Sequence, residues 1–231
     1  MFERLHHQRI ARVLEAINAD LLREYHCYFA GGTAIALREG EFRESVDIDF
    51  VISDPQAYRG LRELLHHEGL IGLFQHPSQS LMLDRPLRMD QYGLRTRIGS
   101  DGHDIKLEII REARLVITPP SPQDQICGVS TATVVDLAAM KLLANADRWA
   151  DDSVFSRDII DLAHLSLDSN SYQQALKIAE DAYGLAIRRD LQKALDALRR
   201  REGWLDRCLY ALAIATPKAL VWKKLRRLRT F

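Results

Sequence analysis

The spacing of apolar residues divides the chain into a first part with helices and strands and a second part with helices alone. Leucine, isoleucine and valine recur at helical intervals from Leu5 to Leu22, which predicts an amphipathic opening helix. The aromatic-rich run YHCYFA at 25–30 and the run VDIDFVI at 46–52 predict short strands. Leucine spacing after Pro55 predicts another helix, which a glycine ends.

The first part ends with short strands, and a proline-rich segment separates it from the second part. From 80 to 110 the chain shows short alternating runs typical of a meander or hairpins. TPPSPQDQ at 118–125 contains three prolines and is the clearest linker, and five Ala- and Leu-rich helical segments follow it. We therefore predict an α+β fold, with an α+β domain at 1–117, a linker at 118–130 and a helical domain at 131–231.

Charge and cysteine content exclude several classes of protein. The 32 basic and 32 acidic residues balance, so a chain that simply coats nucleic acid or an acidic membrane is not expected. Three cysteines without paired spacing predict neither a disulfide framework nor a zinc site. The N-terminus lacks the apolar core of a signal peptide and no apolar run is long enough to span a bilayer, so we expect a cytoplasmic protein without a membrane partner.

The C-terminal segment is locally basic. Its cations alternate with Trp222, Leu225 and Leu228. Two interpretations stay open, a solvated amphipathic helix and a surface that contacts a phosphate backbone. The cations are Lys218, Lys223, Lys224, Arg226, Arg227 and Arg229.

Two acidic residues interrupt the apolar strand predicted at 46–52. Because side chains alternate along a strand, Asp47 and Asp49 are expected on one face, about 6.6 Å apart along the chain, with Ile48 and Phe50 toward the core. Two like charges on one face repel, and a magnesium ion, which prefers oxygen ligands, relieves that repulsion. Two such ions about 4 Å apart would suit a phosphoryl transfer.

A glycine turn lies shortly before the acid pair. Gly31 and Gly32 allow the backbone to approach a ligand closely, and Thr33 is predicted to cap the short helix that follows. The free N–H groups and the dipole at a helix start favour phosphate. The two features together predict a seat for a triphosphate beside a metal site.

The strand HDIKLEII at 103–110 offers a third acid. Alternation puts Asp104, Lys106 and Glu108 on one face, and we favour Glu108 as the third metal ligand. Lys106 would hold Glu108 in place or touch phosphate. The alternative for both residues is an exposed polar face of the strand.

Two later helices contribute charged pairs. Lys141 and Arg148 are seven residues apart and share a helix face, as do Asp158 and Asp161 at three apart. Lys141 lies among apolar residues, where an unpaired ammonium is costly, so it needs a partner unless it reaches solvent from the helix edge. For Asp158 the alternative is an ion pair with Arg157.

Five segments in this order resemble the nucleotidyltransferase AbiEii/AbiGii toxin family. They are GGTAIAL, RESVDID, IKLEI, LAAMKLLANADR and RDIIDL, and they cover about Phe29 to Leu165. That family belongs to the polymerase-β-like nucleotidyltransferase superfamily and is similar to the mycobacterial MenT toxins. The resemblance implies a polymerase-β-like core, a small mixed sheet with flanking helices, followed by a helical C-terminal domain.

The resemblance implies roles for particular residues. Gly31, Gly32, Thr33, Arg43 and Ser45 would bind the nucleotide, with Lys141 on its triphosphate. Asp47, Asp49 and Glu108 would bind metal, and together with Lys141 and Asp158 they would form the catalytic set. The superfamily more often has Gly-Ser than Gly-Gly-Thr, which favours the toxin branch, and a glutamate at 108 reaches farther than the usual aspartate.

Together, the motifs and the resemblance predict a magnesium-dependent enzyme that transfers a nucleotidyl group from a nucleoside triphosphate. The resemblance implies RNA as the acceptor, in particular the 3′ end of tRNA, and a toxin with a cognate antitoxin in a toxin-antitoxin or abortive-infection system. Two alternatives stay open. One is a nucleotide-binding regulatory module without turnover, and the other is a nucleotidyltransferase that modifies a protein or a small molecule.

Overall fold

The computed structural model describes residues 2–75 and 81–229, and the chain divides into two compact units. Unit 1 comprises Met1–Arg38 and Ser45–Thr133, and unit 2 comprises Glu39–Glu44 and Val134–Phe231. Each unit is continuous in space but not in sequence, because the short segment Glu39–Glu44 leaves unit 1 and belongs to unit 2.

The segment predicted as a linker, 118–130, belongs to unit 1 in the structure. Its second half forms a small hairpin of β7 (Gln125–Ile126) and β8 (Val129–Ser130). Directly after the hairpin, the Ala132 amide donates a hydrogen bond to the Phe29 carbonyl at 2.9 Å, and Val129 is fully buried. Because of these contacts, the boundary between the two units lies between Thr133 and Val134, at the start of the first helix of unit 2.

Unit 1 is built on a small mixed sheet. β2 (Ile48–Ile52) and β6 (His103–Arg111) are parallel neighbours, and the remaining pairs are antiparallel. The strand order is β1-β2-β6-β5-β3, and β4 also pairs with β5. The other strands are β1 (Tyr28–Ala30), β3 (Leu81–Met82), β4 (Arg88–Met89) and β5 (Gly93–Ser100).

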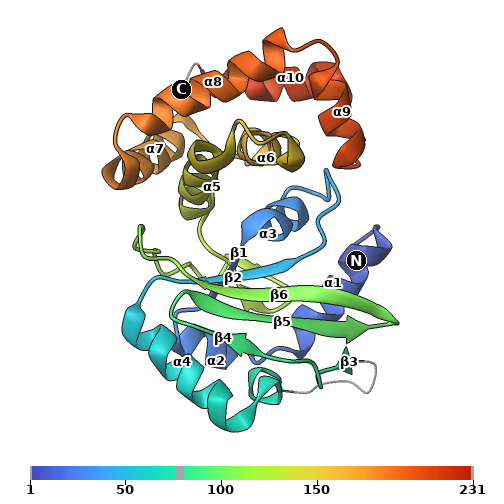
Figure 1. The fold of residues 1–231 in the computed structure, drawn as a ribbon, viewed down its shortest axis with the longest axis vertical. Helices are drawn as coiled ribbons and strands as arrows, with labels where there is room; N and C mark the ends of the chain where they lie inside the picture. Colours follow the sequence, from blue (N-terminus) through green and yellow to red (C-terminus); the bar gives the residue numbers. More distant parts are fainter. Residues whose placement is uncertain (1, 76–80, 230–231) are drawn as a thin grey trace. The chain divides into compact units, whose positions relative to one another are not determined.

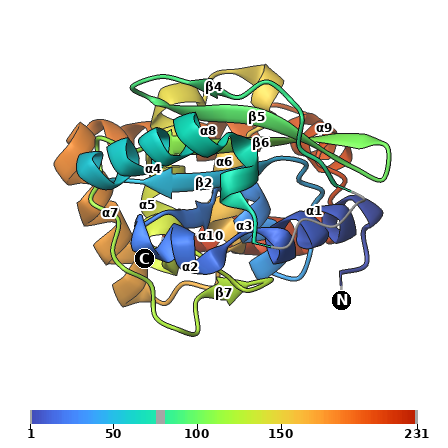
Figure 2. The same ribbon diagram turned by 90° about the horizontal axis from the view of Figure 1, so that it is seen from below.

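The helices of unit 1 lie on both sides of this sheet. α3 (Gly31–Arg38) lies on one side, and α2 (Ala19–Glu24) and α4 (Pro55–Glu68) lie on the other, as Figures 1 and 2 show. α1 (Leu5–Ala16) and the short 3-10 helix η1 (Leu70–Leu73) complete the unit. The core comes from the apolar residues that alternate along the central strands, such as Ile48, Phe50 and Leu107, each 1% exposed or less.

The predicted opening helix from Leu5 to Leu22 is wrong as one element, because the chain breaks between α1 and α2. Ile17 is extended and bridges to Phe74, and the Asn18 amide donates to the Leu73 carbonyl at 2.9 Å. The Asn18 side chain then accepts from the Leu21 amide and caps α2. An uninterrupted apolar pattern does not reveal such a break when the capping residue lies on the polar face.

Unit 2 contains helices and loops, and no strand lies among its described residues. The five predicted helical segments correspond to α5 (Val134–Arg148), α6 (Arg157–His164), α7 (Ser169–Tyr183), α8 (Ala186–Arg200) and α9 (Trp204–Ala211). A short 3-10 helix, η2 (Asp152–Val154), precedes α6, and α10 (Lys218–Arg227) follows α9. The predicted fold class, an α+β core with a small mixed sheet followed by a helical part, is confirmed.

No helix within the two described ranges is long and apolar enough to cross a membrane. The three cysteines are free, as their spacing predicted.

Candidate active site

The turn between β1 and α3 lies against the side chain of Asp49, the second acid of the predicted pair. Gly31 follows β1 directly and has a φ of +73°, which favours glycine. A Cβ atom added at Gly31 would lie 2.4 Å from Asp49 Oδ2, well inside van der Waals contact. The absence of a side chain at residue 31 therefore gives the Asp49 carboxylate room next to the backbone of the turn.

Asp49 lies on β2, but Asp47 lies just outside it. The strand predicted from 46 begins only at Ile48, because its neighbour β1 ends at Ala30, which pairs with Asp49. The core-facing pattern is confirmed, since Ile48 and Phe50 are buried while Asp49 is partly exposed. The prediction that Asp47 shares the face of Asp49 stays a prediction, because Asp47 precedes the regular strand.

Thr33 has a different local role from the predicted helix cap. α3 begins at Gly31, so Thr33 lies inside the first turn, and its hydroxyl donates to the Asp47 carbonyl. The same hydroxyl lies 2.8 Å from the Ser45 hydroxyl, and the Ser45 amide donates to Nε2 of the buried His7. Thr33 and Ser45 thus fix the loop that leads into the acid pair.

Glu108 is the register neighbour of Asp49 on the adjacent parallel strand. Because paired residues on neighbouring strands point to the same face, both carboxylates belong to the polar face of the sheet. Glu108 accepts a hydrogen bond from Arg95 Nε at 3.0 Å and another from Lys106 Nζ. The predicted alternation is confirmed, with Ile105, Leu107 and Ile109 buried on the opposite face; they are each 0% exposed.

The acid pair offers the donor set that magnesium prefers. Asp47 and Asp49 supply carboxylate oxygens, and magnesium is commonly held by one or two carboxylates together with substrate phosphates. Among the described residues, no group of three or more His, Cys, Asp and Glu side chains is placed to hold a metal ion. The residues therefore fit an ion shared with a nucleotide, and Glu108 would join them only after leaving Arg95 and Lys106.

A buried charge cluster in unit 2 contains the predicted helical residues. Lys141 on α5 lies 3.0 Å from Asp158 Oδ1 and 2.6 Å from Asp161 Oδ2, both on α6. Arg148, one heptad after Lys141, also binds Asp158 through two hydrogen bonds of 2.7 and 3.0 Å. Lys141 is 7% exposed, so it is a paired buried lysine and does not reach solvent from the helix edge.

Arg43 completes this cluster from the short segment Glu39–Glu44. Its guanidinium binds the Asp161 carboxylate in a bidentate manner, with Nε–Oδ1 and Nη2–Oδ2 distances of 2.6 and 2.8 Å. Arg43 is 4% exposed and Asp161 is 0% exposed. The guanidinium predicted to bind nucleotide is thus directed at a buried carboxylate of α6.

The cluster sets the protonation of its two acids. Burial by itself raises the pKa of Asp158, but Lys141 and Arg148 outweigh burial and hold that pKa well below its ordinary value. Burial likewise raises the pKa of Asp161, and Lys141 and Arg43 bring it below the ordinary value. Both acids are therefore charged at neutral pH, and the five side chains have a net charge of about +1.

The start of α6 positions Asp158 toward α5. Phe155 and Ser156 both have left-handed backbone conformations, with φ values of 51° and 50°. The Trp204 indole N–H donates to the Ser156 hydroxyl oxygen at 3.0 Å and holds this turn. Asp158 then lies in the first turn of α6, bound to Lys141 and Arg148, and not to its neighbour Arg157 as the alternative supposed.

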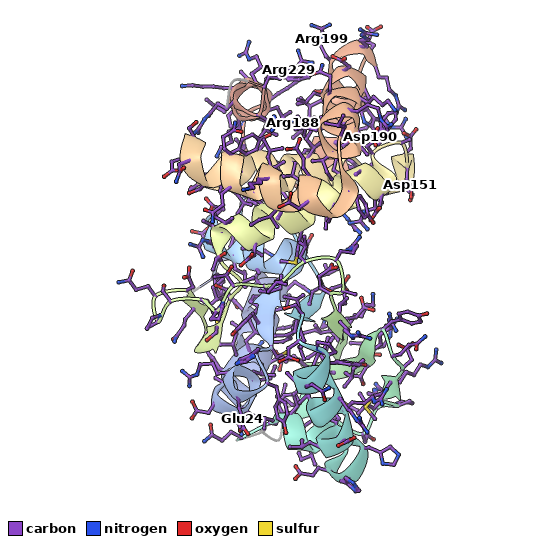
Figure 3. The ribbon with its side chains drawn as sticks, turned by 90° about the vertical axis from the view of Figure 1, so that its left-hand side faces the viewer. Glu24, Asp151, Arg188, Asp190, Arg199 and Arg229 are labelled. Carbon is purple, nitrogen blue, oxygen red and sulfur yellow. The ribbon has the colours of Figure 1, made fainter. Side chains whose placement is uncertain are left out.

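The basic C-terminal segment forms α10, whose Val221 and Leu225 are fully buried. Arg226 and Arg229 of this segment, with Arg199 of α8, border a hollow of 350 Å³. Figure 3 labels Arg199 and Arg229. The amphipathic helix is confirmed, and contact with phosphate stays a prediction. The hollow is lined by Leu195, Arg199, Trp222, Leu225, Arg226 and Arg229.

The decisive comparison is with known protein families. Residues 12–228 match the family described as nucleotidyl transferase AbiEii toxin, type IV TA system. The chain belongs to this family. As an AbiEii protein it is a nucleotidyltransferase and the toxin of a toxin-antitoxin system, which confirms the predicted enzyme class. Membership also implies a nucleotide substrate and a cognate antitoxin.

The match extends the resemblance beyond the 29–165 region to the end of α1 and to the remaining helices of unit 2. No curated protein matches this AbiEii chain. Two solved structures are similar to it, each at 17% identity. A candidate nucleotidyltransferase from H. pylori covers 96% of each chain with a TM-score of 0.46, and JHP933 from Helicobacter pylori covers 87% of this chain and 100% of its own with a TM-score of 0.39.

The substitution Gly31→Ala should separate the close approach to Asp49 from backbone strain. We expect it to lower nucleotidyl transfer about a hundredfold if Asp49 has the predicted role of metal ligand, because displacing its carboxylate by even 1 Å would misplace that ligand. Gly40→Ala is the matched control, since Gly40 has a φ of +74° but nothing within 4 Å of the added Cβ atom.

Both variants should lose about 1 to 2 kcal/mol of unfolding free energy from the left-handed backbone. Urea titration and a transfer assay on both proteins test this difference. Equal activity losses in the two variants would show that strain, and not the contact with Asp49, explains the role of Gly31.

Proposed function

We propose that this AbiEii protein transfers a nucleoside monophosphate from a nucleoside triphosphate to the 3′ end of tRNA, with magnesium at Asp47 and Asp49. The observation that supports this most is the Gly31 backbone directly against the Asp49 carboxylate. This contact places a turn of the type that binds phosphate next to the acid pair, within one unit. The enzyme would act in the cytoplasm, where nucleotides and tRNA are available, with its antitoxin encoded nearby.

The residues of unit 1 have different roles in the proposed site. The backbone of Gly31 and Gly32 receives the phosphates, and Thr33 and Ser45 hold the loop that positions Asp47. Asp47 and Asp49 would hold magnesium, which would stabilise the charge on the transferring phosphate and activate the acceptor hydroxyl. A carboxylate of the site accepts the proton from that hydroxyl while its oxygen bonds to the α-phosphorus, the bond from the α-phosphorus to the bridging oxygen breaks, and pyrophosphate leaves. Glu108, next to Asp49 in register, is our candidate for the third acid and for any second ion.

Lys141 of unit 2 is our candidate for a contact with the triphosphate, as the family resemblance implies. An ammonium group has three N–H donors, and two carboxylates are bound to Lys141, so one donor is left for a phosphate oxygen. Asp158 is a positioning residue in this proposal, since it holds Lys141 and Arg148. Arg43 contributes through Asp161, which it holds in a bidentate pair.

The experiment is incubation of the purified protein with magnesium, total RNA and each α-labelled nucleoside triphosphate in turn. We expect label on a tRNA-sized band with one or a few of the nucleotides. The Asp47→Ala/Asp49→Ala variant, shown to be folded by circular dichroism, should give no label. Label on the protein or on a small molecule instead of RNA would contradict the proposed acceptor and support the alternative substrate class.

A further inference from the structure

A row of charged side chains crosses the polar face of the sheet in unit 1. Register pairs Asp49 on β2 with Glu108 on β6, Glu108 with Arg95 on β5, and Arg95 with Arg88 on β4. Because register partners point to one face, these four residues form a continuous line. With strands about 4.8 Å apart, the line extends about 14 Å from the acid at one end to the arginine at the other.

A second basic pair lies beside this row. Arg97 on β5 is the register partner of Lys106 on β6. Arg88, Arg95 and Arg97 are exposed, while the opposite face of β5 is buried through Leu94 and Ile98, at 1% and 0% exposed. Among the described residues, Arg88 and Arg97 form no ion pair with an acidic side chain, so this end of the face presents uncompensated positive charge.

The inner cations of the face are held by weak pairs. Arg95 and Lys106 bind Glu108, and each is 43% exposed. Arg95 also lies 3.3 Å from Asp90, whose carboxylate accepts from the Tyr92 and Gly93 amides. Glu108 itself is only 14% exposed, but both cations reach solvent, so an incoming polyanion can replace the carboxylate as the partner of Arg95 and Lys106.

The position of the row indicates that its cations bind the acceptor substrate and not the donor nucleotide. In the strand order β1-β2-β6-β5, the phosphate-binding type of turn at Gly31 follows β1, on one side of Asp49. The cations lie on β6, β5 and β4, on the other side of Asp49. A transfer between two phosphate-bearing substrates needs them on opposite sides of the reacting centre, and this sheet offers one seat on each side.

We propose that Arg88, Arg95, Arg97 and Lys106 bind the phosphodiester backbone of the acceptor RNA strand. This inference rests on the proposed transfer to RNA and names the surface that receives the acceptor. It also gives Glu108 a dual role. Without RNA, Glu108 is the counter-ion of Arg95 and Lys106, and when phosphates replace it, its carboxylate becomes available beside Asp49. The arrival of the acceptor thereby completes the acidic site.

The test compares Arg88→Gln/Arg97→Gln with Arg59→Gln, an exposed arginine on α4, whose helix lies on the other side of the sheet. Binding of a fluorescein-labelled single-stranded RNA is measured by anisotropy over a range of salt concentrations. We expect the double variant to bind RNA about tenfold more weakly. Its salt dependence, the slope of log K against log[salt], should be shallower by about 1.4, because each lost phosphate contact on a single strand contributes about 0.7.

A second variant changes affinity in the opposite direction. Glu108→Gln removes the carboxylate that competes with phosphate, so RNA should bind about threefold more tightly, as expected from breaking weak, partly exposed pairs. A purely structural role of Glu108 would not increase affinity. Nucleotide affinity, measured with a non-hydrolysable triphosphate, should be unchanged in the Arg88→Gln/Arg97→Gln protein.

Unchanged RNA affinity and slope in the double variant would overturn the inference, as would a loss of triphosphate binding with RNA binding intact. The binding assay needs no turnover, so it also decides the case in which total RNA is not labelled. In that case the proposed transfer to RNA fails, and the RNA affinity of the double variant still supports or refutes this surface as a phosphodiester site.

Discussion

Asp49→Asn should abolish nucleotidyl transfer while leaving the fold intact. Asparagine has nearly the shape of aspartate, so the contact with Gly31 and the buried neighbours Ile48 and Phe50 stay in place. The change removes the charge of the acid that lies between the turn and Glu108. Because a metal ion stabilises transition-state charge by several kcal/mol, we expect the rate to fall about a thousandfold or more.

Asp104→Asn is the matched control for this variant. Asp104 lies on the same polar face of β6, four residues before Glu108. It is exposed and forms an ion pair with Arg85. The control should retain near-normal transfer. Steady-state rates and circular dichroism spectra of both variants decide the matter, and full activity of a folded Asp49→Asn protein would remove Asp49 from the catalytic set.

Asp161→Asn should strongly destabilise the protein. The carboxylate is fully buried and neutralises Arg43 and Lys141. Removing one partner of a buried ion pair strands the others, at a cost of about 3 to 5 kcal/mol. The midpoint of urea unfolding measures this loss. Asp196→Asn, which breaks the surface pair with Arg229, should leave the midpoint almost unchanged.

The pH dependence of the same variant has a definite sign. Because the pKa of Asp161 is lower in the folded protein, its stabilising contribution is fully present above the unfolded pKa of about 3.9 and is lost as the pH falls toward the folded value. The stability difference between wild type and Asp161→Asn should therefore be constant near neutral pH and shrink below about pH 4. A difference that grows on acidification would contradict a charged Asp161.

Local pattern was enough to predict the element types and the neighbourhood of the acid pair. Alternation along 103–110 gave the correct core and polar faces of β6, since Ile105 and Leu107 are buried. Helical spacing placed Lys141 and Arg148 on one face of a helix, and Asp158 and Asp161 on one face of the next. In the structure the two cations form ion pairs with the two acids. Such features depend on intervals within one element, which the sequence contains directly.

Features that depend on pairing between distant segments were not predictable in this way. The pairing of Arg43 with Asp161 spans 118 residues, and no spacing rule selects that acid over the others. Arg95, the partner of Glu108, was missed. The available signal was the alternation of Arg95 and Arg97 with buried residues on β5, but the register that brings Arg95 to Glu108 is set by the β5–β6 hairpin.

The segment Glu39–Glu44 has a consequence for how this protein can be divided. The chain passes between its two units three times, after Arg38, after Glu44 and after Thr133. A fragment that ends at Thr133 would retain Arg43 but lose its carboxylate partner Asp161. The helical part is therefore not an interchangeable cassette, and recombination at the apparent domain boundary would exchange half of a buried ion pair between unrelated proteins.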